Sequence, residues 1–507
     1  MSVAPANPEL IRNIRAQLRA DRVVTVAVVC AVLSLAVGYS MAYTHGGLGR
    51  VWGLEFLRVA LAAQTFVLVL GGGLVSLLAV QREKEMNTFD FQRVTRLRPL
   101  ELALGKLFGA PVLMYFIVLC LMPAALVGAA VGHARPTFVV AAYVVAVLGA
   151  ISIHALALLL SLLLERGVAV AGGVLFLIVL WLNPLVAARF WLDLGSLSPF
   201  YASDLSTQMT WAVMSRPPGT IIYVPGGYGM TDVLFGWPVH HAVVAVALYA
   251  GFAAWFLLAV VRNIKRDPAG YEIFTPAQAL GFLFFINLIF IGFFRWSRWS
   301  AAEAQADLLG LNTTLCFVLG VALLRTRDRV RRLDARRRLS SGWLAAAWPA
   351  PYLAAGTLLV GLVPVAILQV IGKLDGEWDL GVALFRVALF SAWLLRDVLY
   401  LQWMNLRLGG RLRLGLLYLA VFYICTGIVF GTLNLFGTPS GLAFTAVFMP
   451  PAVFALRLGE WAYTWEVWLA ALGAQILIAG LFVSLQRRTL ADLSLPGRAS
   501  AAAAGAA

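Results

Sequence analysis

The charged residues with the most informative spacing lie in residues 82–106, between two long apolar runs. A charged start leads into a predicted short helix over Thr88–Val94, and Pro99 ends that stretch and opens a second helix. Glu101 falls in the first turn of the second helix, where an acid is favourable. Taken alone, such groups cap helices or remain solvated. The residues singled out in this segment are Glu83, Glu85, Thr88, Pro99, Glu101, Gly105 and Lys106.

Residue patterns of common catalytic and cofactor sites are absent from the sequence. No Gly-x-x-x-x-Gly-Lys-Ser/Thr loop occurs, so we expect no nucleotide phosphate to be held by that route. The aspartates and histidines of residues 189–241 have no recognisable catalytic spacing. Four cysteines lie inside apolar runs without metal or redox spacing, which predicts small packing residues. We therefore expect neither an enzyme nor a resident cofactor or metal.

Ionisable residues inside apolar runs are few, and each is costly in a bilayer. Arg396 and Asp397 are adjacent, so we expect them not to face each other, and both lie near one end of their run. Arg386 is deeper and indicates a polar interior face. We expect structural pairing for these residues and a hydrogen-bonded packing role for His154. Gly71-Gly72-Gly73 predicts close approach of another helix, at the seam between two halves of the chain.

The composition of the chain predicts which kind of secondary structure carries these residues. Of 507 residues, 61% are hydrophobic and 12% are charged, and the mean hydropathy is +0.87, which is more apolar surface than one soluble core buries. Runs of about 18 residues or more are long enough to cross a bilayer as helices. The sequence therefore predicts an all-α polytopic membrane protein with about twelve spans. These are Val23–Tyr43, Val59–Val80, Leu107–Val131, Thr137–Leu164, Val168–Ala188, Ala242–Val261, Ala277–Phe294, Leu308–Leu324, Pro351–Ile371, Leu380–Leu401, Leu414–Phe436 and Val467–Leu485.

Charge position predicts the orientation. The net charge is +15, and the basic residues gather in alternate short loops, whereas the other side holds singles such as Arg50, Arg135 and Arg216. This is the positive-inside pattern, which excludes nucleic-acid binding as the reason for the charge and places both termini in the cytoplasm of an inner-membrane protein. An Asn-Pro start and an amphipathic pattern in residues 1–22 predict an interfacial helix on the cytoplasmic leaflet.

The layout favours two halves of six spans, 23–261 and 262–486. Each half has one large external excursion between its fifth and sixth spans, at 189–241 and at 437–466. Leu442–Leu456 is short and is broken by Pro450-Pro451, so we expect it to be re-entrant. The halves share no convincing residue-level similarity, and the repeat is predicted from layout alone. Residues 487–507 are predicted to be a disordered tail.

The segment 81–106 resembles the coupling loop of type-2 ABC exporter permeases. Those proteins have a charged start, a threonine, a Leu-x-Pro-x-Glu-Leu turn and a Gly-Lys before their third span, and the Asn-Pro-led helix and Ser198-Pro199-Phe200 also fit. The resemblance covers about the first 260 residues. It implies that the loop docks on a separate ABC ATPase, which binds the ATP, and that the chain exports a hydrophobic or amphipathic substrate. The ATPase-coupling residues that the resemblance implies are Glu83, Glu85, Thr88, Pro99, Glu101, Gly105 and Lys106. Asn87 and Phe89-Asp90-Phe91-Gln92 depart from the usual pattern, so the docking surface differs in detail.

Other interpretations remain open at this level. An ion-coupled secondary transporter also uses paired bundles, although a clear set of deep acidic residues is lacking. A lipid-linked transferase would use residues 189–241. The Arg-rich loop 325–349 does not repeat the coupling pattern, and it contacts either the ATPase or anionic lipid.

Overall fold

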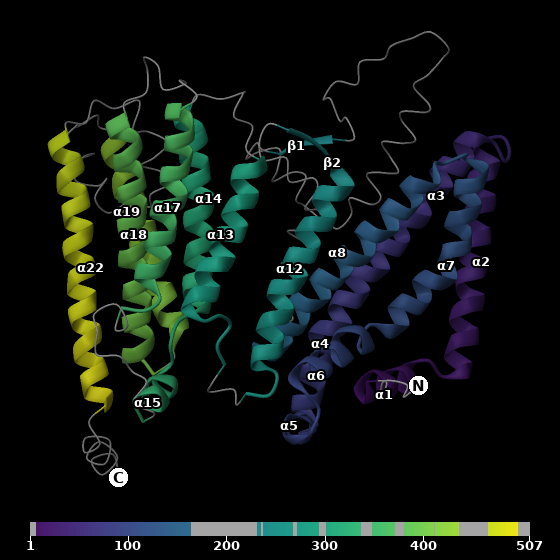
Figure 1. Ribbon diagram of the computed structural model, residues 1–507, viewed down its shortest axis with the longest axis horizontal. Helices are drawn as coiled ribbons and strands as arrows, with labels where there is room; N and C mark the ends of the chain where they lie inside the picture. The colour runs from purple at the N-terminus through teal and green to yellow at the C-terminus, as the bar shows by residue number, and fades with distance from the viewer. Residues whose placement is uncertain are drawn as a thin grey trace, which may run out of the picture. The chain divides into compact units, whose positions relative to one another are not determined.

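The computed structural model describes residues 7–163, 231–234, 237–266, 271–293, 301–335, 347–370, 380–409, 411–435 and 465–494 (Figure 1). Two compact units divide the chain between Tyr271 and Glu272, near the predicted boundary at 261 and 262. Unit 1 is residues 1–271 and unit 2 is residues 272–507. The predicted fifth span and re-entrant segment lie outside the described residues, as does most of the predicted loop 189–241.

The described part of unit 1 consists of helices and one short hairpin. Its elements are α1 (Pro8–Gln17), α2 (Ala20–Thr44), α3 (Arg50–Phe66), the π-helix η1 (Val67–Gly72), α4 (Gly73–Glu85), α5 (Phe89–Val94), α6 (Pro99–Gly109), α7 (Val112–Val131), α8 (Pro136–Leu163), β1 (Thr231–Leu234), β2 (Trp237–His240) and α12 (His241–Asn263). The strands pair antiparallel, with Thr231 opposite His240. Unit 2 contains α13 (Pro276–Phe293), α14 (Ala301–Ala322), α15 (Arg327–Ala335), α17 (Ala350–Val370), α18 (Leu380–Arg407), α19 (Leu412–Leu435) and α22 (Trp465–Ser494).

Seven helices of the described chain are long and apolar enough to cross a membrane, which indicates a multi-pass membrane protein. They are Ala20–Thr44, Arg50–Glu85, Val112–Val131, Pro136–Leu163, Ala242–Asn263, Leu412–Val429 and Leu469–Leu493. Each coincides with a predicted span. Helices α13, α14, α17 and α18 lie at four further predicted spans, and the first three of these contain shorter apolar stretches.

Three boundaries differ from the sequence-based predictions. The second span begins at Arg50, and its α-helical hydrogen bonding is interrupted by η1. The predicted third span is split, because α6 ends at Gly109 and Pro111 precedes the start of α7. Proline has no backbone N–H and clashes with the preceding turn, so it favours this break. Finally, α22 continues to Ser494, so residues 487–494 are helical and not part of a disordered tail.

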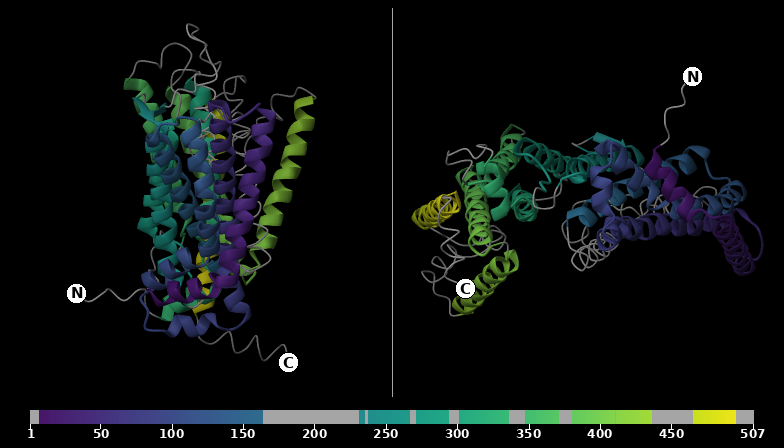
Figure 2. Two further views of the ribbon diagram at one scale, coloured as in Figure 1. Left: turned by 90° about the vertical axis from the view of Figure 1, so that its right-hand side faces the viewer. Right: turned by 90° about the horizontal axis from the view of Figure 1, so that it is seen from below.

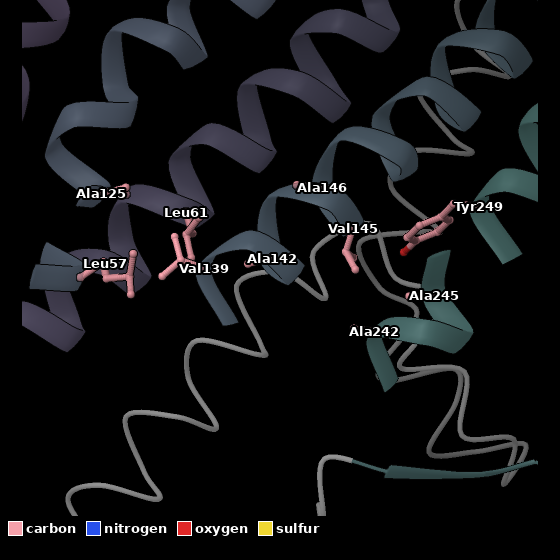
Figure 3. Close-up of a cluster of buried hydrophobic side chains, with 12 residues drawn as sticks. Leu57, Leu61, Ala125, Val139, Ala142, Val145, Ala146, Ala242, Ala245 and Tyr249 are labelled. Carbon is pink, nitrogen blue, oxygen red and sulfur yellow. The ribbon is translucent and has the colours of Figure 1, made fainter. Parts of the chain in front are cut away.

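The core of unit 1 lies where α3, α7, α8 and α12 meet (Figure 3). Leu57 and Leu61 from α3 pack near Val139 and Ala142 from α8, and Tyr249 from α12 closes the cluster. Many of the remaining members are alanines, which let apolar helices approach closely in a bilayer.

Gly72 allows close helix packing inside unit 1, and the predicted seam between halves is a separate matter that stays a prediction. A Cβ at this position would lie 2.2 Å from His154 Nε2. The His154 ring occupies that space, with Nε2 at 2.8 Å from the carbonyl oxygen of Leu68 in η1 and Nδ1 at 2.9 Å from the Tyr115 hydroxyl. A π-helix leaves a carbonyl out of the regular ladder, and His154 provides its partner. The predicted hydrogen-bonded packing role of His154 is confirmed.

Among the described helices of unit 2, α18 packs against four others, α14, α17, α19 and α22. Trp393 and Phe390 are among its fully buried side chains. Because these helices pack against α18, the charged residues in its middle part are shielded from lipid, whereas Arg407 at its end is exposed. This position explains how an apolar bundle accommodates Arg386, Arg396 and Asp397, which are all buried.

Candidate functional site

A cluster of charged side chains joins α1, α4 and α6 at one end of unit 1, where α1 lies across the ends of the long helices (Figures 1 and 2). Lys106 of α6 is 2% exposed and forms ion pairs with Glu83 of α4 and with Glu9 of α1, the latter at 3.4 Å. A buried ammonium group is tolerated only when it is paired. The two carboxylates therefore hold three helices at one point.

Arg12 and Gln92 complete the coordination of the two carboxylates. Arg12 Nη2 lies 2.7 Å from Glu9 Oε1 and 3.0 Å from Glu83 Oε1. The Gln92 side chain on α5 donates to the same Glu83 oxygen at 2.9 Å, and the Phe89 ring centroid lies 5.9 Å from Lys106 Nζ. The cluster thus contains two acids and two bases, contributed by α1, α4 and α6, with α5 packed against it. We call Glu9, Arg12, Glu83, Gln92 and Lys106 the ionic cluster.

Glycines in α6 allow α1 to approach closely enough for these contacts. A Cβ on Gly105 would lie 2.7 Å from Glu9 Cβ, and one on Gly109 would lie 2.9 Å from Asn13 Cβ. Gln17 then donates to the carbonyl oxygens of Gly109 and Ala110, at 3.1 and 3.0 Å. These carbonyls lie at the end of α6, where helical partners are missing. The face of α1 that meets α6 is therefore polar. Ile14, an apolar residue of the same helix, is exposed.

The loop is also tied to the ends of two other long helices. Lys84 Nζ donates to the carbonyl oxygens of Ser161 and Leu162 in the last turn of α8, at 3.3 and 2.7 Å. A cation at this position is favoured by the helix dipole. Lys265, beyond α12, donates to the Thr95 carbonyl oxygen at 2.6 Å. Side-chain contacts thus connect the loop 81–106 with α1, α8 and the segment after α12.

The outer face of α5 exposes two large apolar side chains beside Asp90. Phe91 is 74% exposed and Val94 is 82% exposed, and Met86 and Leu100 on either side are exposed as well. These side chains lie beyond the end of the span Arg50–Glu85. Exposed large apolar side chains on a loop mark an interaction surface when they are grouped. We call Met86, Phe91, Val94 and Leu100 the outer face of the loop.

The residues singled out in the sequence have distinct positions. Glu83, Gly105 and Lys106 meet in the ionic cluster, whereas Glu85 is exposed at the end of α4. The Thr88 hydroxyl donates to the Glu83 carbonyl oxygen at 3.3 Å. Pro99 is the first residue of α6, and the Glu101 carboxylate accepts from the Arg98 backbone N–H at 2.9 Å, as a first-turn acid can.

Sequence reasoning missed Glu9, Arg12 and Gln92. Glu9 has the ordinary place of a first-turn acid and Arg12 that of a solvated base. The signal available in the sequence is the pairing of Glu9 with Arg12 at a spacing of three on a helix, but this spacing does not reveal the partner 97 residues away. The described residues include no group of three or more His, Cys, Asp or Glu that could hold a metal ion.

Unit 2 contains a second buried ionic group. Arg396 Nε donates to Asp397 Oδ1 at 2.7 Å, Nη1 donates to Gln475 of α22 at 2.8 Å, and Nη2 donates to the Tyr423 hydroxyl of α19 at 2.6 Å. Tyr423 also donates to Asp397, and the Trp393 ring centroid lies 4.4 Å from the Arg396 guanidinium. The prediction that Arg396 and Asp397 do not face each other is wrong, because the long arginine side chain bends back to its neighbour.

Comparison with known families, curated proteins and solved structures finds no match for this chain.

Proposed function

We propose that this chain is the membrane-spanning permease subunit of an ATP-driven ABC exporter, and that the outer face of the loop docks on a separate ATPase subunit. The observation that carries the proposal is the two-sided character of α5. Its outer side presents Phe91 and Val94 to a partner, while Phe89 and Gln92 on its inner side pack against the ionic cluster. The resemblance of residues 81–106 to the coupling loop of type-2 permeases supports the same assignment.

The ionic cluster provides the path for the coupling movement. When the ATPase moves α5, the displacement reaches α4 through Glu83 and Gln92, and it reaches α6 and α1 through Lys106. Lys84 carries it to α8. Buried ion pairs with several hydrogen bonds are sensitive to small displacements, because their stabilising energy depends steeply on distance and angle. Glu83 and Lys106 are therefore positioning residues in the proposed mechanism.

The proposal includes the full topology expected from the sequence. Twelve spans in two halves of six enclose a pathway for a hydrophobic or amphipathic substrate, with both termini in the cytoplasm of an inner-membrane protein. The partner ATPase binds the ATP, and this chain needs no cofactor of its own. Seven long apolar helices and four further helices at predicted spans support this layout.

The test is recovery of an ATPase with the full-length chain solubilised gently from its native host. We expect the wild-type chain to retain an ABC ATPase. The double variant Phe91→Ser/Val94→Ser should retain at least tenfold less of it. Leu48→Ser is the matched control, because Leu48 is 69% exposed and lies between α2 and α3, at the opposite end of unit 1. Absence of any ATPase with the wild-type chain, or equal retention by the double variant, refutes the proposal.

A second candidate function is ion-coupled secondary transport. The observation that favours it is Asp397, a buried carboxylate within a predicted span, which is bonded to Arg396 and Tyr423. Buried acids of this kind carry protons or ions in many transporters. Substrate transport by the purified chain in liposomes, driven by an ion gradient without ATPase or ATP and abolished in Asp397→Asn, would establish this function in place of the first.

A further inference from the structure

Four helices of unit 2 bring exposed arginines to one end of the bundle. Helix α18 ends at Arg407 and α19 begins at Leu412, so their joined ends lie together. Phe482 of α22 packs against Tyr400 and Trp403, near the end of α18, which places the last turns of α22 at the same level. Six arginines at this end are exposed, and we call them the basic rim: Arg331, Arg407, Arg411, Arg413, Arg487 and Arg488.

Helix α15 is attached to this end by arginines that do not belong to the basic rim. The Arg327 guanidinium donates to the carbonyl oxygens of Leu406 and Arg407, which are the terminal acceptors of α18. Arg329 forms an ion pair with Glu272. The Arg327 charge serves the fold, as expected for a cation at a helix C-terminus, and the Arg329 charge is paired with an acid. Arg331 lies about one turn after Arg327 along α15 and is exposed.

The rim lies where apolar helix meets polar surface. The apolar part of α19 begins at Leu412, beside Arg411 and Arg413, and the candidate span of α22 contains Arg487 and Arg488 near its end. Trp403 lies 5.5 Å from the Arg407 guanidinium. Tryptophan next to arginine at the end of an apolar helix is typical of a membrane interface. Among side chains described at this end, only Asp328 and Asp492 are exposed acids.

We propose that the basic rim binds the phosphate headgroups of anionic phospholipids and so anchors unit 2 to the charged leaflet. Guanidinium groups bind phosphate oxygens through paired hydrogen bonds, and clustered arginines at a bilayer surface attract anionic lipid. Only Arg331 of the rim belongs to the Arg-rich loop, and for this residue the proposal favours lipid over the ATPase. This inference is independent of the proposed function.

The experiment counts phosphatidylglycerol and phosphatidylcholine retained by the purified full-length chain from mixed micelles that contain equal amounts of both, by native mass spectrometry. We expect preferential retention of phosphatidylglycerol by the wild-type chain. An attraction of about 1 kcal/mol for each arginine corresponds to roughly fivefold in affinity. Arg411→Gln/Arg413→Gln and, separately, Arg487→Gln/Arg488→Gln should each lower phosphatidylglycerol affinity by roughly 25-fold, and added salt should weaken retention.

The matched control is Arg50→Gln/Arg135→Gln, which removes two exposed arginines of unit 1, one at the start of α3 and one just before α8, and should leave lipid retention unchanged. Equal retention of the two lipids by the wild-type chain, or the same loss in the control, overturns the proposal. Displacement of phosphatidylglycerol by an equal concentration of inorganic phosphate would identify a simple ion site instead. Unchanged lipid retention together with loss of a bound ATPase in the rim variants would identify protein docking instead.

Discussion

Replacement of Lys106 by methionine should reveal how strongly the ionic cluster holds unit 1 together. Methionine keeps an unbranched apolar side chain but removes the cation between Glu9 and Glu83, whose side chains are 6% and 12% exposed. Removing one partner of a buried pair typically costs about 3–5 kcal/mol, because an unpaired charge remains. Arg12 still reaches both carboxylates but is 53% exposed, which weakens its compensation. We therefore expect the free energy of unfolding to fall by about 3 kcal/mol, near the lower limit of that range.

The assay is equilibrium unfolding of the purified chain in detergent, with a double-mutant cycle for Lys106→Met and Glu83→Gln. The two changes should be less harmful together than their sum, by about 1–3 kcal/mol, because the second removes the carboxylate left unpaired by the first. Lys265→Met is the matched control. Lys265 donates to one exposed carbonyl oxygen, so its replacement should cost less than about 1 kcal/mol. A Lys106→Met cost no larger than the control, or strict additivity in the cycle, would refute a cooperative cluster.

Three further substitutions test the packing described above by thermal unfolding in detergent. Gly105→Ala brings a Cβ within 2.7 Å of the Glu9 side chain on α1 and should cost about 1–3 kcal/mol of stability. The control Gly427→Ala in α19 meets no atom within 4 Å and should be neutral or stabilising. Equal effects of the two changes would contradict the close approach of α1. Gly72→Ala should cost at least about 2 kcal/mol because it displaces His154 from the Leu68 carbonyl, and an unchanged melting temperature would exclude this lock. Tyr423→Phe should cost about 1–2 kcal/mol by removing hydroxyl contacts to the buried pair of α18, and retention of full stability would show that the hydroxyl is dispensable.

The sequence alone predicted the features that depend on residues close together in the chain. Long apolar runs form helices because each backbone group is satisfied within its own segment. Asn7 accepts from the backbone N–H groups of Glu9 and Leu10, and Pro99 begins α6, as local capping rules require. The two short helices in residues 82–106 follow from the same rules. Glu83, Gly105 and Lys106 were singled out because their segment resembles the coupling loop of type-2 ABC permeases.

Tertiary structure decided which of these groups meet. The Glu9 partner of Lys106 lies 97 residues earlier in the chain, and the His154 that occupies the space beside Gly72 comes from a different helix. Arg396 reaches its own neighbour Asp397 only because α19 and α22 supply Tyr423 and Gln475 as further partners. Helical spacing specifies the face on which a residue lies, but not which helix packs there or at what height. Those depend on side-chain packing between distant segments, where a missing Cβ or one buried charge determines the contact.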